Sequence, residues 1–222
     1  MDVSIVLPVY RNADALEELH RRLCAVMQKE DLSFEIVFVD DRSPDRSLEL
    51  LKTLRPATVV ANAFNLGQHR SVLCGIGRAS GGIVVVMDAD LQDEPETIPL
   101  LLRRLERGDV HCVFAGRRGL YEAWHRQVTS LLFHSLIRLI TGVPRGAGMF
   151  FAADRLMVSR LLAYRDPDPF VVAMIGCTGL RVTAIPVQRR ARPFGRSSYS
   201  SWSRLSIGIR AIKMIYRLKF RI

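Results

Sequence analysis

Short apolar runs alternate with stretches of helical periodicity along the first part of the chain. Four apolar runs have the length and the β-branched content of buried strands: residues 3–9, 34–39, 58–61 and 82–87. Between them apolar residues recur at every third or fourth position, which predicts helices over residues 16–27, 48–54 and 67–79. Buried strands that alternate with helices are typical of a parallel sheet with helices on both faces. The pattern therefore predicts the α/β class, with a mostly parallel sheet.

Polar residues follow three of these predicted strands directly. The polar clusters are residues 10–12, 40–45 and 88–93. In a parallel sheet the carboxyl ends of the strands meet at one edge, and ligands bind there. Each cluster taken alone is explained equally well by an ordinary turn, since Asp, Asn and Pro favour turns. Because all three should lie at the same edge, we interpret them together as a binding site.

Two carboxylates separated by one residue, Asp88 and Asp90, follow the fourth predicted strand. They can converge on a hard divalent cation, with Gln92 supplying a neutral oxygen. Such a set suits Mg²⁺ or Mn²⁺, which completes its shell with water and a substrate diphosphate. The alternative is the acidic first turn of a helix, where carboxylates favour the helix dipole. That alternative accounts for Asp93 and Glu94, but not for two carboxylates placed against the end of an apolar strand.

The adjacent pair Asp40 and Asp41 follows the second predicted strand. An Asp pair at a sheet edge can accept hydrogen bonds from a base N–H or from ribose hydroxyls, whereas a turn needs only one such side chain. We therefore favour a nucleoside site over a turn for this pair.

Five motifs occur in a set order along the chain and extend this interpretation. They are residues 7–12 (LPVYRN), 39–45 (VDDRSPD), 65–69 (NLGQH), 87–96 (MDADLQDEPE) and 192–199 (RPFGRSSY). In this order they resemble the family 2 glycosyltransferases, and most of all the polyprenyl-phosphate branch of dolichol-phosphate mannose synthase-like enzymes. The resemblance covers nearly the whole chain. It implies a GT-A fold, a UDP- or GDP-linked nucleotide-sugar donor, and transfer with inversion to a polyprenyl phosphate at the cytoplasmic face of a membrane.

The resemblance also implies roles for particular residues. The donor nucleoside would be bound by Pro8, Tyr10, Asp40 and Asp41, with Asp88 beside them. The metal and the diphosphate would be bound by Asp88, Asp90 and Gln92. The acceptor phosphate would be bound by Arg117, Arg126 and Ser130, together with Arg192 and Ser197 of a mobile loop. The residues expected to act most directly on the reaction are Asp90, Arg117 and Arg126.

The acceptor clamp also has a rationale in the residue types themselves. Planar guanidinium groups and a hydroxyl are suitable donors to a phosphate. Arg126 and Ser130 are four positions apart, so a helix over residues 124–139 would present them on one face. The apolar residues of that stretch would pack the helix or contact a lipid tail, and packing is the commoner role. His69 and His125 are not needed as bases, because a phosphate acceptor is already anionic.

Two positions depart from the pattern of the family. Residues 148–152 read Gly-Met-Phe-Phe-Ala, where many relatives have an Asp and an Arg. Arg42 stands where a Gly is usual, which adds a charge near the nucleoside.

The net charge of +10 is unevenly distributed along the 222 residues. Residues 169–222 contain eleven Lys and Arg residues and no Asp or Glu, and the rest is close to neutral. Over residues 202–222 the cations and the apolar residues form separate stripes at helical spacing. A basic amphipathic helix of this kind suits an anionic membrane surface, although a merely solvated face is about as common. Nucleic acid is not expected, since no aromatic stacking series accompanies the charge.

Composition sets the outer limits of the interpretation. An apolar fraction of 49% excludes a disordered chain. Four scattered cysteines predict reduced thiols, and no apolar run is long enough for a membrane span. We expect a catalytic domain over residues 1–200, a basic helix over residues 201–222, and a cytoplasmic protein bound peripherally to the membrane. Many relatives continue into membrane-spanning helices at this point. A membrane-anchoring partner, a homo-oligomer, or membrane-spanning helices removed from the sequence as given are therefore further possibilities.

Two other functions remain open from the residues alone. One is a glycosyltransferase that acts on a soluble or carbohydrate hydroxyl acceptor. The other is a non-catalytic module that binds a nucleotide-sugar or a lipid surface, against which the intact Asp-x-Asp motif argues. The sugar and the choice between UDP and GDP also remain open, since either base can donate to an Asp at the sheet edge.

Overall fold

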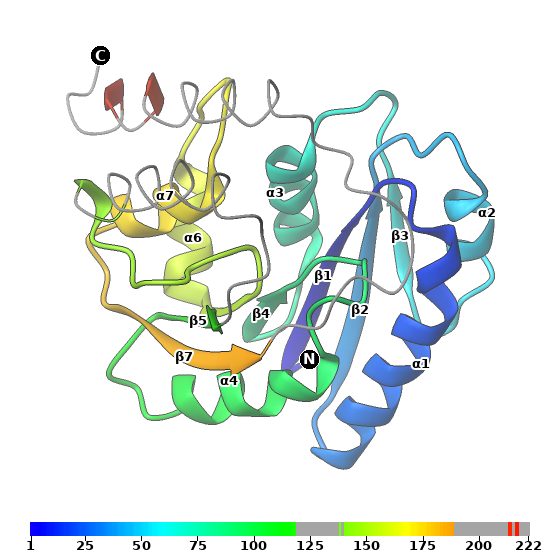
Figure 1. Ribbon diagram of the computed structural model, residues 1–222, viewed down its shortest axis with the longest axis horizontal. Coiled ribbons are helices and arrows are strands. Elements are labelled where there is room, and N and C mark those ends of the chain that lie inside the picture. Colours follow the sequence, from blue (N-terminus) through cyan, green and yellow to red (C-terminus); the bar gives the residue numbers. More distant parts are fainter. Residues whose placement is uncertain (119–137, 139, 189–212, 215, 218–222) are drawn as a thin grey trace.

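A mixed β-sheet forms the centre of the molecule in the computed structural model (Figure 1). The structure describes residues 1–118, 138, 140–188, 213, 214, 216 and 217. Within these residues the sheet has seven strands in the order β3-β2-β1-β4-β6-β5-β7. They are β1 (Val3–Val9), β2 (Phe34–Asp40), β3 (Thr58–Ala61), β4 (Ile83–Val86), β5 (Cys112–Arg118), β6 (Phe151–Asp154) and β7 (Val182–Gln188).

The sheet is parallel except at β6. Strand β1 pairs in parallel with β2 and β4, and β2 pairs in parallel with β3. Strand β6 is antiparallel to both β4 and β5, while β5 and β7 are parallel. The carboxyl ends of β1, β2 and β4 therefore lie at one edge, as the sequence predicts, and the end of β5 lies at the same edge. The predicted α/β class and mostly parallel sheet are confirmed.

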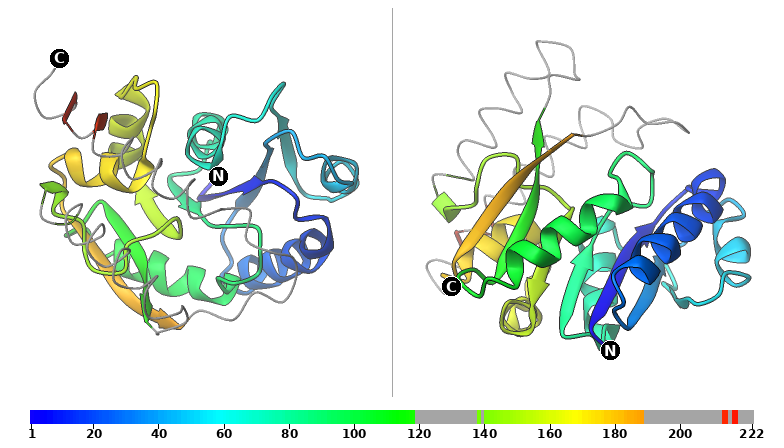
Figure 2. Two further views of the ribbon diagram at one scale, coloured as in Figure 1. Left: turned by 45° about the horizontal axis from the view of Figure 1, so that its top comes forward. Right: turned by 90° about the horizontal axis from the view of Figure 1, so that it is seen from below.

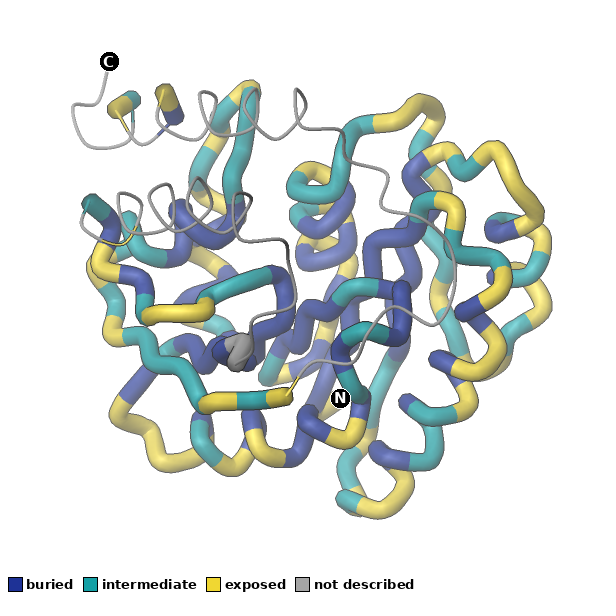
Figure 3. The backbone as a smooth tube through the Cα atoms, in the orientation of Figure 1, coloured by how far each residue is buried: buried dark blue, intermediate teal, exposed yellow. Residues whose placement is uncertain are grey.

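Helices cover both faces of the sheet (Figure 2). One face packs against α1 (Ala13–Lys29), α2 (Ser47–Leu51) and α4 (Ile98–Leu105), the last preceded by a 3₁₀ turn at Pro95–Thr97. The other face packs against α3 (Gln68–Arg78), α6 (Arg155–Ala163) and α7 (Val171–Cys177). Successive strand residues point to opposite faces, so Ile5 and Leu7 join the first cluster and Val6 joins the second. Figure 3 shows the central strands buried along most of their length.

Helix α3 approaches the sheet closely because of a glycine. A Cβ atom at Gly75 would lie 2.4 Å from Cγ1 of Val6 and 2.8 Å from Cγ2 of Val39. The helix starts directly after Gly67, whose φ of 85° is in the region that favours glycine. The predicted start of this helix near residue 67 is thus confirmed, and it places the 62–68 loop at the edge that carries the polar clusters.

A few residues near the C-terminus are described and contact the domain. Met214 is fully buried against the cluster that contains α6 and α7. The guanidinium of Arg217 donates to both carboxylate oxygens of Asp166, with N–O distances of 2.9 and 2.6 Å. The predicted helix over residues 124–139 and most of the predicted basic helix lie outside the described residues. In the part of the chain that the structure describes, no helix combines the length and the apolarity needed to cross a membrane.

Candidate functional site

The loops that follow β1 and β2 are held together by hydrogen bonds. The backbone N–H groups of Arg11 and Asn12 donate to the hydroxyls of Ser43 and Ser47, at 3.3 and 3.2 Å. The N–H of Ala13, in the first turn of α1, donates to Asp45 at 3.3 Å. The polar clusters after β1 and β2 therefore form one continuous surface at the sheet edge.

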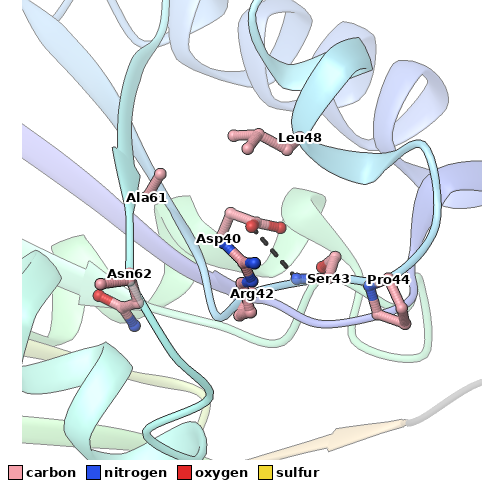
Figure 4. Close-up of a pocket in the computed structure, with 8 residues that line it drawn as sticks. Asp40, Arg42, Ser43, Pro44, Leu48, Ala61 and Asn62 are labelled. Atoms are coloured by element: carbon pink, nitrogen blue, oxygen red, sulfur yellow. Dashed lines mark hydrogen bonds between the residues drawn. The ribbon is translucent and has the colours of Figure 1, made fainter.

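A pocket of about 600 Å³ opens at the end of β2 (Figure 4). Asp40 lies in its wall with only 1% of its surface exposed. Its Oδ2 atom accepts a hydrogen bond from the N–H of Ser43 at 3.2 Å, whereas its buried Oδ1 atom has no partner among the described residues. Such a group is costly to bury unless a ligand satisfies it. The remaining wall is formed by Arg42, Ser43, Pro44, Leu48, Ala61, Asn62 and Ala63.

The neighbouring Asp41 has a different environment. Its carboxylate accepts hydrogen bonds from the backbone N–H groups of Leu66 and Gly67, at 2.7 and 2.8 Å, and from the side-chain amide of Asn62 at 3.0 Å. The amide of Asn65 donates to the Asp41 carbonyl oxygen at 3.2 Å. Asp41 thus orders the loop between β3 and α3, while Asp40 lines the pocket and keeps one buried oxygen without a partner among the described residues.

The carboxylates after β4 are positioned by amide donors. Asp88 is half-buried, and its Oδ1 atom accepts a hydrogen bond from the side chain of Gln68 at 2.5 Å. Asp90 is 6% exposed, and its Oδ1 atom accepts a hydrogen bond from the N–H of Gln92 at 3.1 Å. Because Gln68 is the first residue of α3, the loop that Asp41 orders also reaches the carboxylate pair.

The carboxylate pair can be tested for its fit to a divalent metal. Among the described residues no group of three or more His, Cys, Asp or Glu side chains is placed to hold a metal ion. Asp88 and Asp90 alone offer an oxygen set that suits Mg²⁺ or Mn²⁺ when water and a diphosphate complete the shell. The residues therefore fit a hard cation that binds together with a phosphorylated ligand.

The backbone at this edge is strained at three loops. Arg11, Arg42 and Leu91 have φ values of 59°, 60° and 57°, one residue in each loop after β1, β2 and β4. The left-handed region costs a non-glycine residue about 1–2 kcal/mol. Strain of this kind persists where the surrounding structure holds it, often at functional sites.

The other predicted site residues are placed as follows. Pro8 is buried in β1, and Tyr10 is half-buried at its end, with the Arg11 guanidinium carbon 5.3 Å from its ring centroid. The backbone of Arg117 lies in β5 near the same sheet edge. The side chain of Arg117 lies outside the described part of the structure. So do four further predicted residues: Arg126, Ser130, Arg192 and Ser197. The structure thus places the residues that are predicted to bind the donor and the metal at one edge of the sheet, and their roles stay predictions.

His69 lies in the first turn of α3 and contacts the start of α7. Its Nδ1 atom accepts a hydrogen bond from the N–H of Val171 at 3.3 Å, and its ring lies 4.6 Å from that of Phe170 between centroids. Burial lowers the pKa of His69 to about 4, so the ring is neutral at pH 7. That His69 is not needed as a base follows from the expected phosphate acceptor and stays a prediction.

Sequence reasoning missed the roles of several polar residues. Ser43 and Asn62 fix the carboxylates of the Asp pair, and Gln68 fixes Asp88. The available signal was a concentration of amides around Gly67, directly after an apolar run. The pattern of the chain does not say which carboxylate each amide reaches.

A family model and several proteins match the chain. The model for glycosyl transferase family 2 matches residues 4–162. An undecaprenyl-phosphate 4-deoxy-4-formamido-L-arabinose transferase of Sodalis glossinidius is 34% identical over 205 residues, covering 89% of this chain and 63% of that protein. The transferase of the same name from Pseudomonas fluorescens is 36% identical over 208 residues, covering 89% of this chain and 60% of that protein. The chain therefore spans less than two thirds of these relatives.

Solved structures of low sequence identity share the fold. Glucosyl-3-phosphoglycerate synthase from Mycobacterium tuberculosis, in complex with Mn²⁺, UDP and phosphoglyceric acid, matches with a TM-score of 0.73 and 20% identity, covering 98% of this chain and 78% of that one. The mannosyltransferase PcManGT from Pyrobaculum calidifontis, in complex with GDP-Man and Mn²⁺, matches with a TM-score of 0.67 and 20% identity, covering 97% of this chain and 64% of that one. These similarities support the GT-A architecture predicted from the sequence.

Proposed function

The chain belongs to glycosyl transferase family 2, and on that premise we propose that it transfers a sugar from a nucleotide-sugar to a polyprenyl phosphate. The relatives are named as undecaprenyl-phosphate transferases, which supports a polyprenyl phosphate as the acceptor. The single observation that supports the nucleotide-sugar donor is the buried Oδ1 atom of Asp40, which lines a pocket and has no partner among the described residues.

The donor would lie along the sheet edge from β2 to β4. Asp40 would accept a hydrogen bond from the base, with Pro8 and Tyr10 beside the nucleoside. Asp41 would act indirectly, by ordering the loop that carries Gln68. Strands β2 and β4 are separated by β1, so their ends lie about 10 Å apart at the usual strand spacing. That span suits a nucleoside at one end and its diphosphate at the other.

Asp88, Asp90 and Gln92 would hold Mg²⁺ or Mn²⁺ together with the diphosphate. When bound, the cation would neutralise the charge of the departing nucleoside diphosphate. Gln68 would fix the rotamer of Asp88 through its 2.5 Å hydrogen bond, and Asp90 would be fixed by the N–H of Gln92. The complexes of the structural neighbours with Mn²⁺ support the use of a divalent metal.

The acceptor phosphate would be bound by Arg117, Arg126 and Ser130, with Arg192 and Ser197 added from the loop over residues 192–199. Two anions repel each other, so planar cationic donors would be needed to align the phosphate with the anomeric carbon. A phosphate oxygen would then displace the nucleoside diphosphate in line, with inversion. Since the attacking oxygen is already anionic, no side chain would have to remove a proton.

The protein would work at the cytoplasmic face of the membrane, bound peripherally. Residues 1–200 would form the catalytic domain, and the basic stretch over residues 201–222 would contact anionic lipids. Each cation near such a surface contributes about 1 kcal/mol. A membrane-anchoring partner or a second copy of the chain would strengthen the attachment.

Mass spectrometry of the lipid product tests this function. The protein would be incubated with Mn²⁺, a short polyprenyl phosphate and a panel of UDP- and GDP-sugars. We expect a glycosyl-phosphoryl-polyprenol that disappears in Asp90→Asn and persists in Asp14→Asn, a matched change at an exposed carboxylate of α1. Release of nucleotide without any lipid product would overturn the assignment of polyprenyl phosphate as the acceptor and would favour a hydroxyl acceptor instead. No consumption of any donor would favour a non-catalytic binding module.

A further inference from the structure

Arg42 lies in the wall of the Asp40 pocket. Its side chain is exposed, and among the described residues its guanidinium makes no ion pair. Its φ of 60° is in the left-handed region, where an arginine is strained and a glycine is not. A strained, charged residue without a structural partner, beside a buried and unpartnered acceptor, indicates a role in ligand binding.

The position of Arg42 along the sheet indicates which part of a nucleotide it contacts. It follows β2, whereas the carboxylate pair follows β4, and β1 lies between them. At about 4.8 Å per strand, the Asp40 pocket is about 10 Å from the end that would hold the diphosphate. This inference rests on the proposed function, in which the pocket receives the nucleoside. Arg42 is then at the base end of the donor and not at its phosphates.

The two side chains offer complementary hydrogen-bonding groups. Asp40 presents one buried acceptor, since its other oxygen is engaged by the N–H of Ser43. Arg42 carries only donors and stays charged at any working pH. Both side chains line the same pocket, and Figure 4 shows Leu48 and Ala61 on the side of Asp40 away from Arg42. An acceptor beside a donor matches a base edge on which an N–H adjoins a carbonyl.

Uracil and guanine present such an edge, whereas cytosine and adenine present an amino group beside an unprotonated ring nitrogen. We propose that Arg42 is a specificity-determining residue, which donates to the base carbonyl while Asp40 accepts from the adjacent N–H. Arg42 thereby selects keto bases against amino bases. With an amino base the Arg42 donors would face an amino group, and the Asp40 acceptor would face a ring nitrogen lone pair. A site built on polar pairing rejects such an analogue, here because the buried Asp40 oxygen is left unpaired.

Binding of nucleoside monophosphates in metal-free buffer tests this proposal. Dissociation constants of UMP, CMP, GMP and AMP would be measured by calorimetry for the protein and for Arg42→Gln. We expect the protein to prefer UMP over CMP or GMP over AMP, and Arg42→Gln to reduce that preference about tenfold, the effect of one charge-assisted hydrogen bond. The matched control is Arg46→Gln, an exposed arginine at the start of α2 that does not line the pocket. It should leave the preference unchanged.

A second variant separates binding from folding. Arg42→Gly relieves the left-handed strain, so its melting temperature should equal or exceed that of the protein while its preference for keto bases falls. A preference that is unchanged in both variants would overturn the proposal. Weaker binding of UMP without weaker binding of uridine would also overturn it, because Arg42 would then contact a phosphate. If the unmodified protein binds none of these nucleotides, the proposed function itself fails, and that outcome is distinct from a loss confined to the variants.

Discussion

The adjacent carboxylates of Asp40 and Asp41 show how far a residue's neighbours decide its role. Asp40 has a buried oxygen without a partner, whereas Asp41 accepts hydrogen bonds from two backbone N–H groups and one side-chain amide. The sequence predicts that the pair lies at the sheet edge, because it follows an apolar strand. It does not predict the division of roles, because that depends on the loop over residues 62–67, which is close only in the folded chain.

Exchanging each carboxylate for an amide should separate binding from stability. Asp41→Asn places an N–H₂ group against backbone donors, and we expect a loss of about 2 kcal/mol in the free energy of unfolding. Asp40→Asn should leave that free energy nearly unchanged and weaken nucleotide binding at least tenfold. Denaturant unfolding and calorimetry measure the two effects. Equal losses of stability in both variants would contradict the division of roles between Asp40 and Asp41.

His69 should make the stability of the protein depend on pH. Its pKa is lowered from 6.5 to about 4 by burial, so the folded state favours the neutral ring. Between those values the unfolded chain binds more protons, and stability falls as the pH is lowered from about 6.5 towards 4, then levels off. The variant His69→Asn keeps an acceptor for the Val171 N–H and cannot titrate. We expect the difference between the unfolding curves of the two proteins to change over that pH range, and a constant difference would refute this role of His69.

At the scale of whole elements, the sequence predicts the first half of the sheet well and the second half poorly. Strands β1 to β4 and helices α1 and α3 follow from uninterrupted apolar runs and clear helical periods. The strands beyond β4 were not predicted. Strand β6 is short, antiparallel and inserted between β4 and β5, and it pairs with segments distant in sequence. A local pattern carries no information about such pairings.

The packing of helix α3 can be tested at its glycines. Gly75→Ala would place a Cβ atom 2.4 Å from Val6, and we expect a loss of about 1–3 kcal/mol in the free energy of unfolding from overpacking. Gly77→Ala, two positions along the same helix, meets only Leu162 at 3.9 Å. That change should stabilise the protein by about 0.5–1 kcal/mol, through its higher helix propensity. The same sign of change in both variants would contradict the close approach of α3 to the sheet.

At the scale of the whole molecule, Met214 is connected to the candidate site by a series of contacts. Met214 accepts a hydrogen bond from the N–H of Phe170 at 3.2 Å, and Phe170 packs on His69. The residue before His69 is Gln68, whose side-chain amide donates a hydrogen bond to Asp88. The sequence predicts a basic amphipathic helix over residues 201–222, and within that stretch Met214 is buried in the core.

Truncating the buried Met214 side chain should therefore affect the entire domain. Met214→Ala removes a fully buried side chain, and we expect a loss of about 2–3 kcal/mol in the free energy of unfolding, in one cooperative transition. Circular dichroism during denaturant unfolding gives both the free energy and the number of transitions. A stability equal to that of the unmodified protein would mean that residues near 214 fold independently.

The most direct test of the account is the effect of Mn²⁺ on the affinity for UDP and GDP. Two carboxylates without further acidic ligands among the described residues should bind a cation strongly only together with a diphosphate, and such coupling is reciprocal. We predict that Mn²⁺ lowers the dissociation constant of one of these nucleotides at least tenfold in the protein and in Asp14→Asn, and that the effect disappears in Asp90→Asn. An equal effect of Mn²⁺ in Asp90→Asn would contradict the assignment of this sheet edge as the nucleotide-sugar site.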